Sequence, residues 1–276
     1  MSHQKYLTKY GPWALVTGAS SGIGKAIAIN LGNRGFNLVL VGRAEKRLQE
    51  TQQTIQKNQQ IEVKTFALDL GSDGALKILA TQTEGLDIGL YVASAGFGTS
   101  GLFIETNQKD EKDMLMVNCA FLMESTKLFS HRMVNRGSGG IILLSSIVGF
   151  QGMPNAAHYA ATKSYVQTFG EALHFELKNL GVDVLVAAPG STNSGFADIA
   201  GMKMGNALKP EHIADPILNS LGKRVTVLPG FLSKLLVYSL ITLPRFFRIM
   251  IMGSVMNGMT KHRKSEINAK SPLTAN

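Results

Sequence analysis

The sequence predicts an α/β protein in which a doubly wound parallel sheet carries helices on both faces. Six short segments are apolar on both faces, as strands buried inside a parallel sheet are. Helical patterns separate these segments, and this alternation implies right-handed crossovers between strands. No linker or repeat interrupts it before Gly190, which favours a single domain. The six segments are WALVTG, NLVLVGR, VKTFALDL, DIGLYVASAG, GIILLSS and VDVLVAAPG.

Helices are expected between these strands, over residues 23–34, 45–57, 73–81, 109–136 and 159–180. A loop rich in small residues follows over 190–210. The segment KPEHIADPILNSLG then predicts a short helix with Pro210 at its start, and RVTVLP predicts a last strand. We therefore expect a sheet domain over residues 1–228, and an apolar helical extension with a basic tail over 229–276.

Composition limits the classes of protein that fit. Hydrophobic residues make up 45% of the 276 residues and charged residues 17%, which suits a well-buried core. The single cysteine, Cys119, rules out an internal disulfide and fits a reducing compartment. The N-terminus lacks the continuous apolar core of a secretion signal, so we expect a cytoplasmic protein.

The net charge of +9 does not predict a nucleic-acid partner. The two ends of the chain hold five of the nine positive charges, and no basic stripe with interleaved aromatic residues appears between them. The basic tail is either a solvated segment or one attracted to an anionic membrane surface.

A glycine-rich turn, TGASSGIGKAIA, follows the first strand and opens a helix. Glycines let the backbone approach a pyrophosphate, and a helix N-terminus offers unpaired N–H groups and partial positive charge. A nucleoside-triphosphate loop is excluded, because Ala26 stands after Lys25 where that loop needs Ser or Thr. The turn therefore predicts a dinucleotide site made by Gly18, Ser20, Ser21, Gly22, Ile23 and Gly24.

The end of the second strand predicts which dinucleotide binds. NAD sites place an acidic residue there for the ribose 2′-hydroxyl, whereas this strand ends in Gly42 and Arg43. An arginine suits a 2′-phosphate, so we predict NADP(H). The alternative is that Arg43 only starts the next helix.

The segment YAATK places Tyr159 and Lys163 one helical turn apart. A tyrosine hydroxyl titrates near pH ~10, and a neighbouring cation favours its ionised form and lowers its pKa. The pair is therefore a candidate for general acid–base catalysis, although such pairs are also common on helix surfaces.

Together, TGASSGIG, Asn118, LLSSIVG with Ser146, and YAATK resemble the short-chain dehydrogenase/reductase family over about residues 10–230. Ser146 stands thirteen residues before Tyr159, as in that family. The resemblance implies a Rossmann fold with Asn118, Ser146, Tyr159 and Lys163 as catalytic residues. Tyr159 would protonate a carbonyl oxygen that Ser146 polarises, and Asn118 would hold a water that relays protons to Lys163. Further cofactor contacts implied by the resemblance are Asp69, Leu70, Ala95, Gly96, Pro189, Gly190 and Thr192, besides Tyr159 and Lys163.

One position departs from the family pattern. Ser94 stands where the family usually has asparagine, before Ala95 and Gly96. The shorter side chain puts local rigidity in doubt more than activity.

The expected substrate pocket is mostly apolar. Besides Ser146 it should contain Phe97, Phe150, Met153 and Phe196, which predicts an apolar carbonyl substrate such as a 3-oxoacyl or steroid-like ketone. The predicted function is NADPH-dependent reduction of that carbonyl. The alternative is a catalytically silent NADP-binding regulator or scaffold. No metal site is expected, because His158 and His174 are not grouped with acids or cysteine at ligand spacing.

The segment 231–259 contains the uncharged run LLVYSLITLP, which is too short to span a bilayer. Its helices either pack over the pocket or at a subunit interface, or lie on a membrane surface as a peripheral contact. The family resemblance also implies a homo-dimer or homo-tetramer, formed through the long helices at 109–136 and 159–180.

Overall fold

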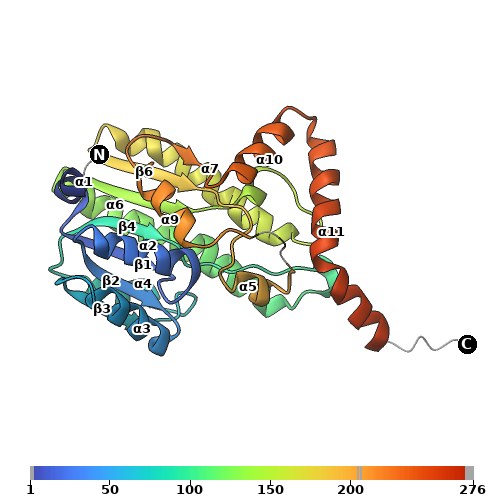
Figure 1. Cartoon of the computed structure of the whole chain (residues 1–276), viewed down its shortest axis with the longest axis horizontal. Coiled ribbons are helices and arrows are strands. Elements are labelled where there is room, and N and C mark those ends of the chain that lie inside the picture. The colour runs from blue at the N-terminus through green and yellow to red at the C-terminus, as the bar shows by residue number, and fades with distance from the viewer. Residues whose placement is uncertain (1–2, 204, 206, 271–276) are drawn as a thin grey trace, which may run out of the picture.

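Seven parallel strands form the central sheet, in the order β3-β2-β1-β4-β5-β6-β7 (Figure 1). The computed structural model describes residues 3–203, 205 and 207–270. The predicted doubly wound α/β fold is confirmed. The strands are β1 Trp13–Thr17, β2 Asn37–Gly42, β3 Val63–Ala67, β4 Ile88–Ala93, β5 Gly139–Leu144, β6 Val182–Ala187 and β7 Thr226–Val227.

Helices cover both faces of this sheet. One face carries α2 (Gly22–Asn33), α3 (Glu45–Gln56) and α9 (Glu211–Leu218), and the other carries α4 (Ala75–Gln82), α6 (Leu122–Arg136) and α7 (Ala157–Lys178). Every residue of β1, β4 and β5 is buried as a result. Burial on both faces explains why the strands are continuous apolar runs in the sequence.

The order in which the chain adds strands to the sheet reverses between β1 and β4. Strands β2 and β3 lie on one side of β1, and β4 to β7 lie on the other. Thr17 at the end of β1 is paired with Val41 of β2 on one side and with Ala93 of β4 on the other. Loops that leave β1 and β4 in opposite directions open a crevice at their carboxyl ends, which is where ligands bind in such sheets.

Two local features were not expected from the sequence. A helix, α1 (His3–Tyr10), precedes the first strand and buries Tyr6 and Tyr10 in the core on the α2 face. The predicted helix 109–136 is divided into α5 (Gln108–Leu115), a π-helical turn over Met116–Phe121, and α6. Such turns are frequent at functional sites, and Asn118 lies inside this one.

The C-terminal helices α10 (Phe231–Ile241) and α11 (Arg245–Lys270) form one end of the molecule, beyond α7 and α5 (Figure 1). They follow β7 after a short turn, near the domain boundary expected at residue 228, which stays a prediction. None of the helices in the described part of the chain has the length and apolar character needed to cross a membrane. Residues 271–276 of the predicted basic tail lie outside the described residues.

Candidate active site

The glycine-rich turn lies at the crevice and packs too closely for larger residues. Gly18 and Gly22 have φ angles of +70° and +56°, which side chains disfavour. A Cβ on Gly18 would lie 2.9 Å from the backbone of Ala95, and one on Gly22 would lie 2.6 Å from Cβ of Ser194. The turn ends at the start of α2, whose preceding Ser21 makes no side-chain cap. The first N–H groups of α2 are thus left for a phosphate, so these residues fit a dinucleotide.

A cavity of about 1000 Å³ runs from this turn in both directions. Arg43 and Arg47 line one end of it. The sequence analysis predicted Arg43 but missed Arg47. Both side chains are exposed, and Arg43 precedes the first residue of α3, Glu45. Arg43 therefore belongs to the loop after β2 and reaches the cavity, as a residue for a 2′-phosphate should. The remaining predicted cofactor residues also line the cavity, namely Gly18, Ser20, Ser21, Gly22, Ile23, Gly24, Asp69, Leu70, Ala95, Gly96, Tyr159, Lys163, Pro189, Gly190 and Thr192.

The backbone beside the glycine turn is held by Thr17 rather than by Ser94. The hydroxyl of Thr17 accepts hydrogen bonds from the N–H groups of Ser94 and Ala95, at 3.1 and 3.2 Å. The side chain of Ser94 lines the cavity instead. In the family an asparagine at position 94 would make this loop rigid. Here the hydroxyl of Thr17 holds the loop instead.

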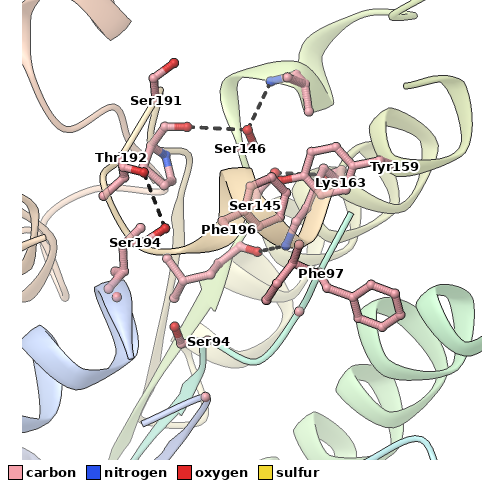
Figure 2. Close-up of a pocket in the computed structure, with 18 of the residues that line it drawn as sticks. Ser94, Phe97, Ser145, Ser146, Tyr159, Lys163, Ser191, Thr192, Ser194 and Phe196 are labelled. Atoms are coloured by element: carbon pink, nitrogen blue, oxygen red, sulfur yellow. Dashed lines mark hydrogen bonds between the residues drawn. The ribbon is translucent and has the colours of Figure 1, made fainter. Parts of the chain in front are cut away.

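Tyr159 and Lys163 project from α7 toward Ser146, which lies in the loop after β5 (Figure 2). The Lys163 ammonium lies 5.9 Å from the centre of the Tyr159 ring and donates a hydrogen bond to the carbonyl oxygen of Leu144 at 2.8 Å. The Ser146 hydroxyl donates to the carbonyl oxygen of Pro189 at 3.4 Å. Ser145 ties the two segments together, because its hydroxyl donates to the backbone oxygen of Lys163 at 2.9 Å.

Burial shifts the pKa values of both Tyr159 and Lys163. It raises the pKa of Tyr159 well above its ordinary value, while the hydrogen bond with Ser146 lowers it. It also lowers the pKa of Lys163 to about 8. The sequence analysis expects Lys163 to lower the pKa of Tyr159, but in this chain alone the desolvation of the phenol outweighs any such effect.

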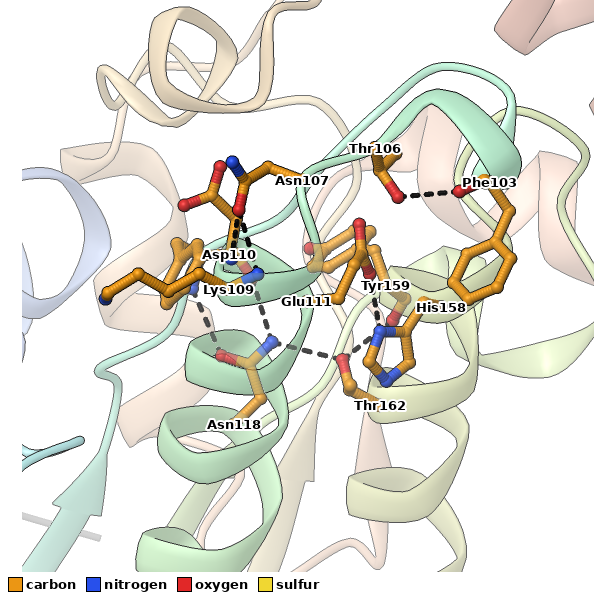
Figure 3. A network of polar contacts seen from close by, with 11 residues as sticks. Phe103, Thr106, Asn107, Lys109, Asp110, Glu111, Asn118, His158, Tyr159 and Thr162 are labelled. Carbon is orange, nitrogen blue, oxygen red and sulfur yellow. Dashed lines mark hydrogen bonds and ion pairs between the residues drawn. The ribbon is translucent and has the colours of Figure 1, made fainter.

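Asn118 lies behind the cavity and does not line it. Its side-chain amide donates to the backbone oxygen of Phe97 at 2.8 Å and to the Thr162 hydroxyl at 3.1 Å, and its oxygen accepts from the N–H of Phe97 at 3.1 Å (Figure 3). This buried amide fixes the loop after β4 to α7. Its proton-relay role stays a prediction.

A second polar contact joins α5 to α7 next to Tyr159. His158 Nδ1 lies 2.5 Å from a carboxylate oxygen of Glu111, which is buried (Figure 3). Among the described residues no group of three His, Cys, Asp or Glu is arranged to hold a metal ion. The Glu111–His158 pair thus connects two helices that flank the cluster of Ser146, Tyr159 and Lys163.

The other end of the cavity is apolar. Phe97, Met153 and Phe196 line it as predicted, and the Phe196 ring lies 5.2 Å from the Tyr159 ring. Residues missed by the sequence analysis complete this end, namely Met202, Leu236, Met252, Met256 and Met259. The i,i+4 spacing of Met252 and Met256 on one helical face was the available signal.

Phe150, which the sequence analysis places in the substrate pocket, does not line the cavity. Phe150 ends a 3₁₀ turn, Ile147–Phe150, and packs with Ala188, Leu228 and Val237 instead. Those residues come from the end of β6, the end of β7 and α10, so the partly buried side chain packs between the sheet and the C-terminal extension. Nothing local in the sequence shows that this apolar cluster forms.

Comparison with known proteins agrees with this geometry. The family model described as short chain dehydrogenase matches residues 12–202. The chain belongs to this family. It is therefore an oxidoreductase of a family that uses nicotinamide cofactors.

Two curated relatives of this short-chain dehydrogenase are similar over most of its length. One is a very-long-chain 3-oxoacyl-CoA reductase of Pyrenophora tritici-repentis, 33% identical over 79% of this chain and 67% of the relative. The other is a 7beta-hydroxysteroid dehydrogenase of Clostridium sardiniense, 30% identical over 82% of this chain and 88% of the relative.

Solved structures show the same fold. A structure from a study of 7beta-hydroxysteroid dehydrogenase stereoselectivity has a TM-score of 0.83 and 29% identity, and the match covers 90% of this chain and 99% of that one. An NAD(P)-dependent gluconate 5-dehydrogenase homologue from Beutenbergia cavernae, with NADP bound at low occupancy, has a TM-score of 0.71 and 27% identity, and the match covers 79% of this chain and 94% of that one.

Proposed function

We propose that this dehydrogenase uses NADPH to reduce a carbonyl group on an apolar, lipid-like substrate. The observation that carries the proposal is the composition of a single cavity. It joins two arginines and a glycine turn, the Ser146–Tyr159–Lys163 cluster and an end rich in methionine. Cofactor, proton donor and apolar substrate can therefore meet in one space.

The proposed cofactor is NADP(H) rather than NAD(H). Arg43 and Arg47 supply two guanidinium groups at the cavity end where a ribose 2′-phosphate would bind, and guanidinium suits phosphate. The NADP bound at low occupancy by the NAD(P)-dependent Beutenbergia homologue is compatible with this choice.

In the proposed reaction the chain orients the carbonyl and delivers a proton. A bound NADPH supplies the hydride, from C4 of its nicotinamide. Ser146 donates a hydrogen bond to the carbonyl oxygen and polarises it. Tyr159 protonates that oxygen, and Lys163 stabilises the phenolate that remains. Asn118 keeps the loop at Phe97 in register with α7.

The proposed substrate class is a ketone on a long acyl chain or a steroid-like ring system. The methionine side chains at the apolar end adapt to irregular hydrocarbon shapes. The names of both curated relatives, a 3-oxoacyl-CoA reductase and a hydroxysteroid dehydrogenase, support this class.

The test is NADPH oxidation, followed by absorbance, with 3-oxoacyl thioesters, steroid ketones, quinones and small aldehydes. Tyr159→Phe should lower turnover ~100–10,000-fold, because it removes the acid. NADPH binding by this variant, measured by fluorescence, should be retained. Tyr165→Phe changes an exposed tyrosine of the same helix and is the matched control.

The silent regulator or scaffold is the alternative that this assay distinguishes. Binding of NADPH without turnover of any ketone would favour it. Turnover that survives in Tyr159→Phe would instead contradict the proposed acid.

A further inference from the structure

An unusual amount of apolar surface is exposed at the corner between α10 and α11. The exposed side chains that we call the apolar corner are Phe231, Leu235, Tyr238, Ile241, Phe246 and Phe247. Phe231 is 79% exposed and Phe246 is 67% exposed. The first four recur at helical spacing along one face of α10, while Val237 and Leu240 on its other face are buried. A contiguous exposed face of this kind indicates a partner.

The segment that carries the apolar corner contributes only positive charges. Lys234 and Arg245 are exposed beside it and Arg248 is half-buried, and the sequence has no acidic residue between Asp215 and Glu266. None of these three cations forms an ion pair with another of the described residues. Aromatic and aliphatic residues interleaved with unpaired cations are the composition of helices that lie in the headgroup region of anionic membranes.

A second copy of the chain fits this surface poorly. A two-fold interface pairs a patch with itself, so the cations of one corner would approach those of the other. The corner offers no carboxylate to neutralise them. Phe231 and its neighbour Leu232 also line the cavity, so a seated copy would cover the cavity at that point.

We propose that the apolar corner docks on an anionic lipid bilayer, with its aromatic side chains inserted among the headgroups and its cations on lipid phosphates and carboxylates. The cavity would then face the bilayer through Phe231 and Leu232. The docking itself does not depend on the proposed function. It would bring the active site to the medium in which lipid-like ketones dissolve.

The test is co-sedimentation with vesicles, without cofactor or substrate, so that its result is independent of catalysis. Wild type should bind vesicles of equimolar phosphatidylcholine and phosphatidylserine and bind pure phosphatidylcholine far less. Phe246→Ser with Phe247→Ser should weaken binding at least about tenfold, because two inserted rings are lost. Neither residue lines the cavity. Ile78→Ser, at an exposed site on α4, is the matched control and should bind as wild type does.

A charge variant tests the lipid partner separately. Lys234→Gln with Arg245→Gln should weaken binding to the anionic vesicles roughly 30-fold, whereas Lys77→Gln with Lys112→Gln should not. Absence of wild-type binding, or equal losses in variants and controls, would overturn the proposal. So would a wild-type dimer in lipid-free solution that the Phe246→Ser, Phe247→Ser variant converts to monomers, because a second copy would then cover the corner.

Discussion

Lys163 holds an ammonium group in a buried position, where its charge is poorly solvated. Only 7% of the residue is exposed, and the carbonyl oxygen of Leu144 is its one hydrogen-bond acceptor among the described residues. Buried charged groups are typical of active sites, where function requires a group that lowers the stability of the folded protein. The effect of this buried charge on the free energy of unfolding should be measurable.

Replacing Lys163 should change how stability depends on pH. Burial lowers the pKa of Lys163 from 10.5 to about 8, so between these values the unfolded chain binds a proton that the folded chain lacks. The free energy of unfolding of wild type therefore rises with pH through this window, by up to about 3 kcal/mol. Lys163→Met lacks this contribution, so the variant should be relatively more stable at neutral pH and lose that advantage near pH 10.5. Urea unfolding at both pH values measures the difference; a difference that does not change with pH would contradict the prediction.

At the scale of elements, the loop after β2 presents Arg43 to the cavity and the first turn of α3 presents Arg47 to it. If they bind a 2′-phosphate, Arg43→Leu should raise KM for NADPH roughly 10–100-fold and leave KM for NADH nearly unchanged. Arg47→Leu should act in the same direction. Lys46→Leu, an exposed cation of the same helix that does not line the cavity, is the matched control. An equal rise for NADPH and NADH would contradict a 2′-phosphate role.

Helix α1 illustrates what the sequence could not predict. Its apolar residues are few, and its position depends on partners far along the chain: Tyr10 donates to Asp183 of β6 at 2.5 Å, and Tyr6 packs on Phe36 with ring centres 6.0 Å apart. Lys9 pairs with the same Asp183 carboxylate. Short helices of this kind are stabilised by tertiary packing rather than by their own propensity.

Removing the Tyr10 hydroxyl should therefore destabilise the whole domain. Tyr10→Phe keeps the buried ring but leaves the Asp183 carboxylate with one partner fewer, and we expect a loss of ~1–3 kcal/mol in the free energy of unfolding. Tyr238→Phe, which changes a tyrosine that is 62% exposed, should have no measurable effect. Denaturant unfolding of both variants gives the comparison, and equal stability of Tyr10→Phe and wild type would show that α1 does not contribute through this bond.

The strands, the glycine turn and the Ser146–Tyr159–Lys163 cluster could be predicted because their signals are local: apolar runs, fixed spacings and one helical turn. The apolar end of the cavity could not, since Met252 and Met256 reach it from α11, far along the chain from Tyr159. The position of the Phe150 side chain could not be predicted for the same reason, because it depends on contacts with Val237 and Leu228. The π-helical turn at Asn118 likewise has no signature in an otherwise regular helical pattern.

At the scale of the whole molecule, a second apolar recess lies on the surface of the single chain. It has a volume of about 350 Å³ and lies between α6 and α7, the helices expected to pair in an oligomer. Its lining comes from both helices and the turn after α7, and its apolar residues are Met123, Val134, Phe169, Leu173, Leu177 and Leu180. The oligomer stays a prediction, and this recess gives it a residue to test.

Leu180→Asp should convert the predicted dimer or tetramer to smaller species. Leu180 is 50% exposed in the single chain, so the substitution should leave the monomer folded while placing a carboxylate in the apolar interface. We expect its dissociation constant to rise at least roughly tenfold, as for a hot-spot residue. Ile78→Asp, at a site on α4 that is 47% exposed, makes the same change away from the recess and should assemble as wild type does. Light scattering over a concentration series measures both. A wild type that is monomeric throughout would remove the oligomer, and equal assembly of the two variants would move the interface away from α6 and α7.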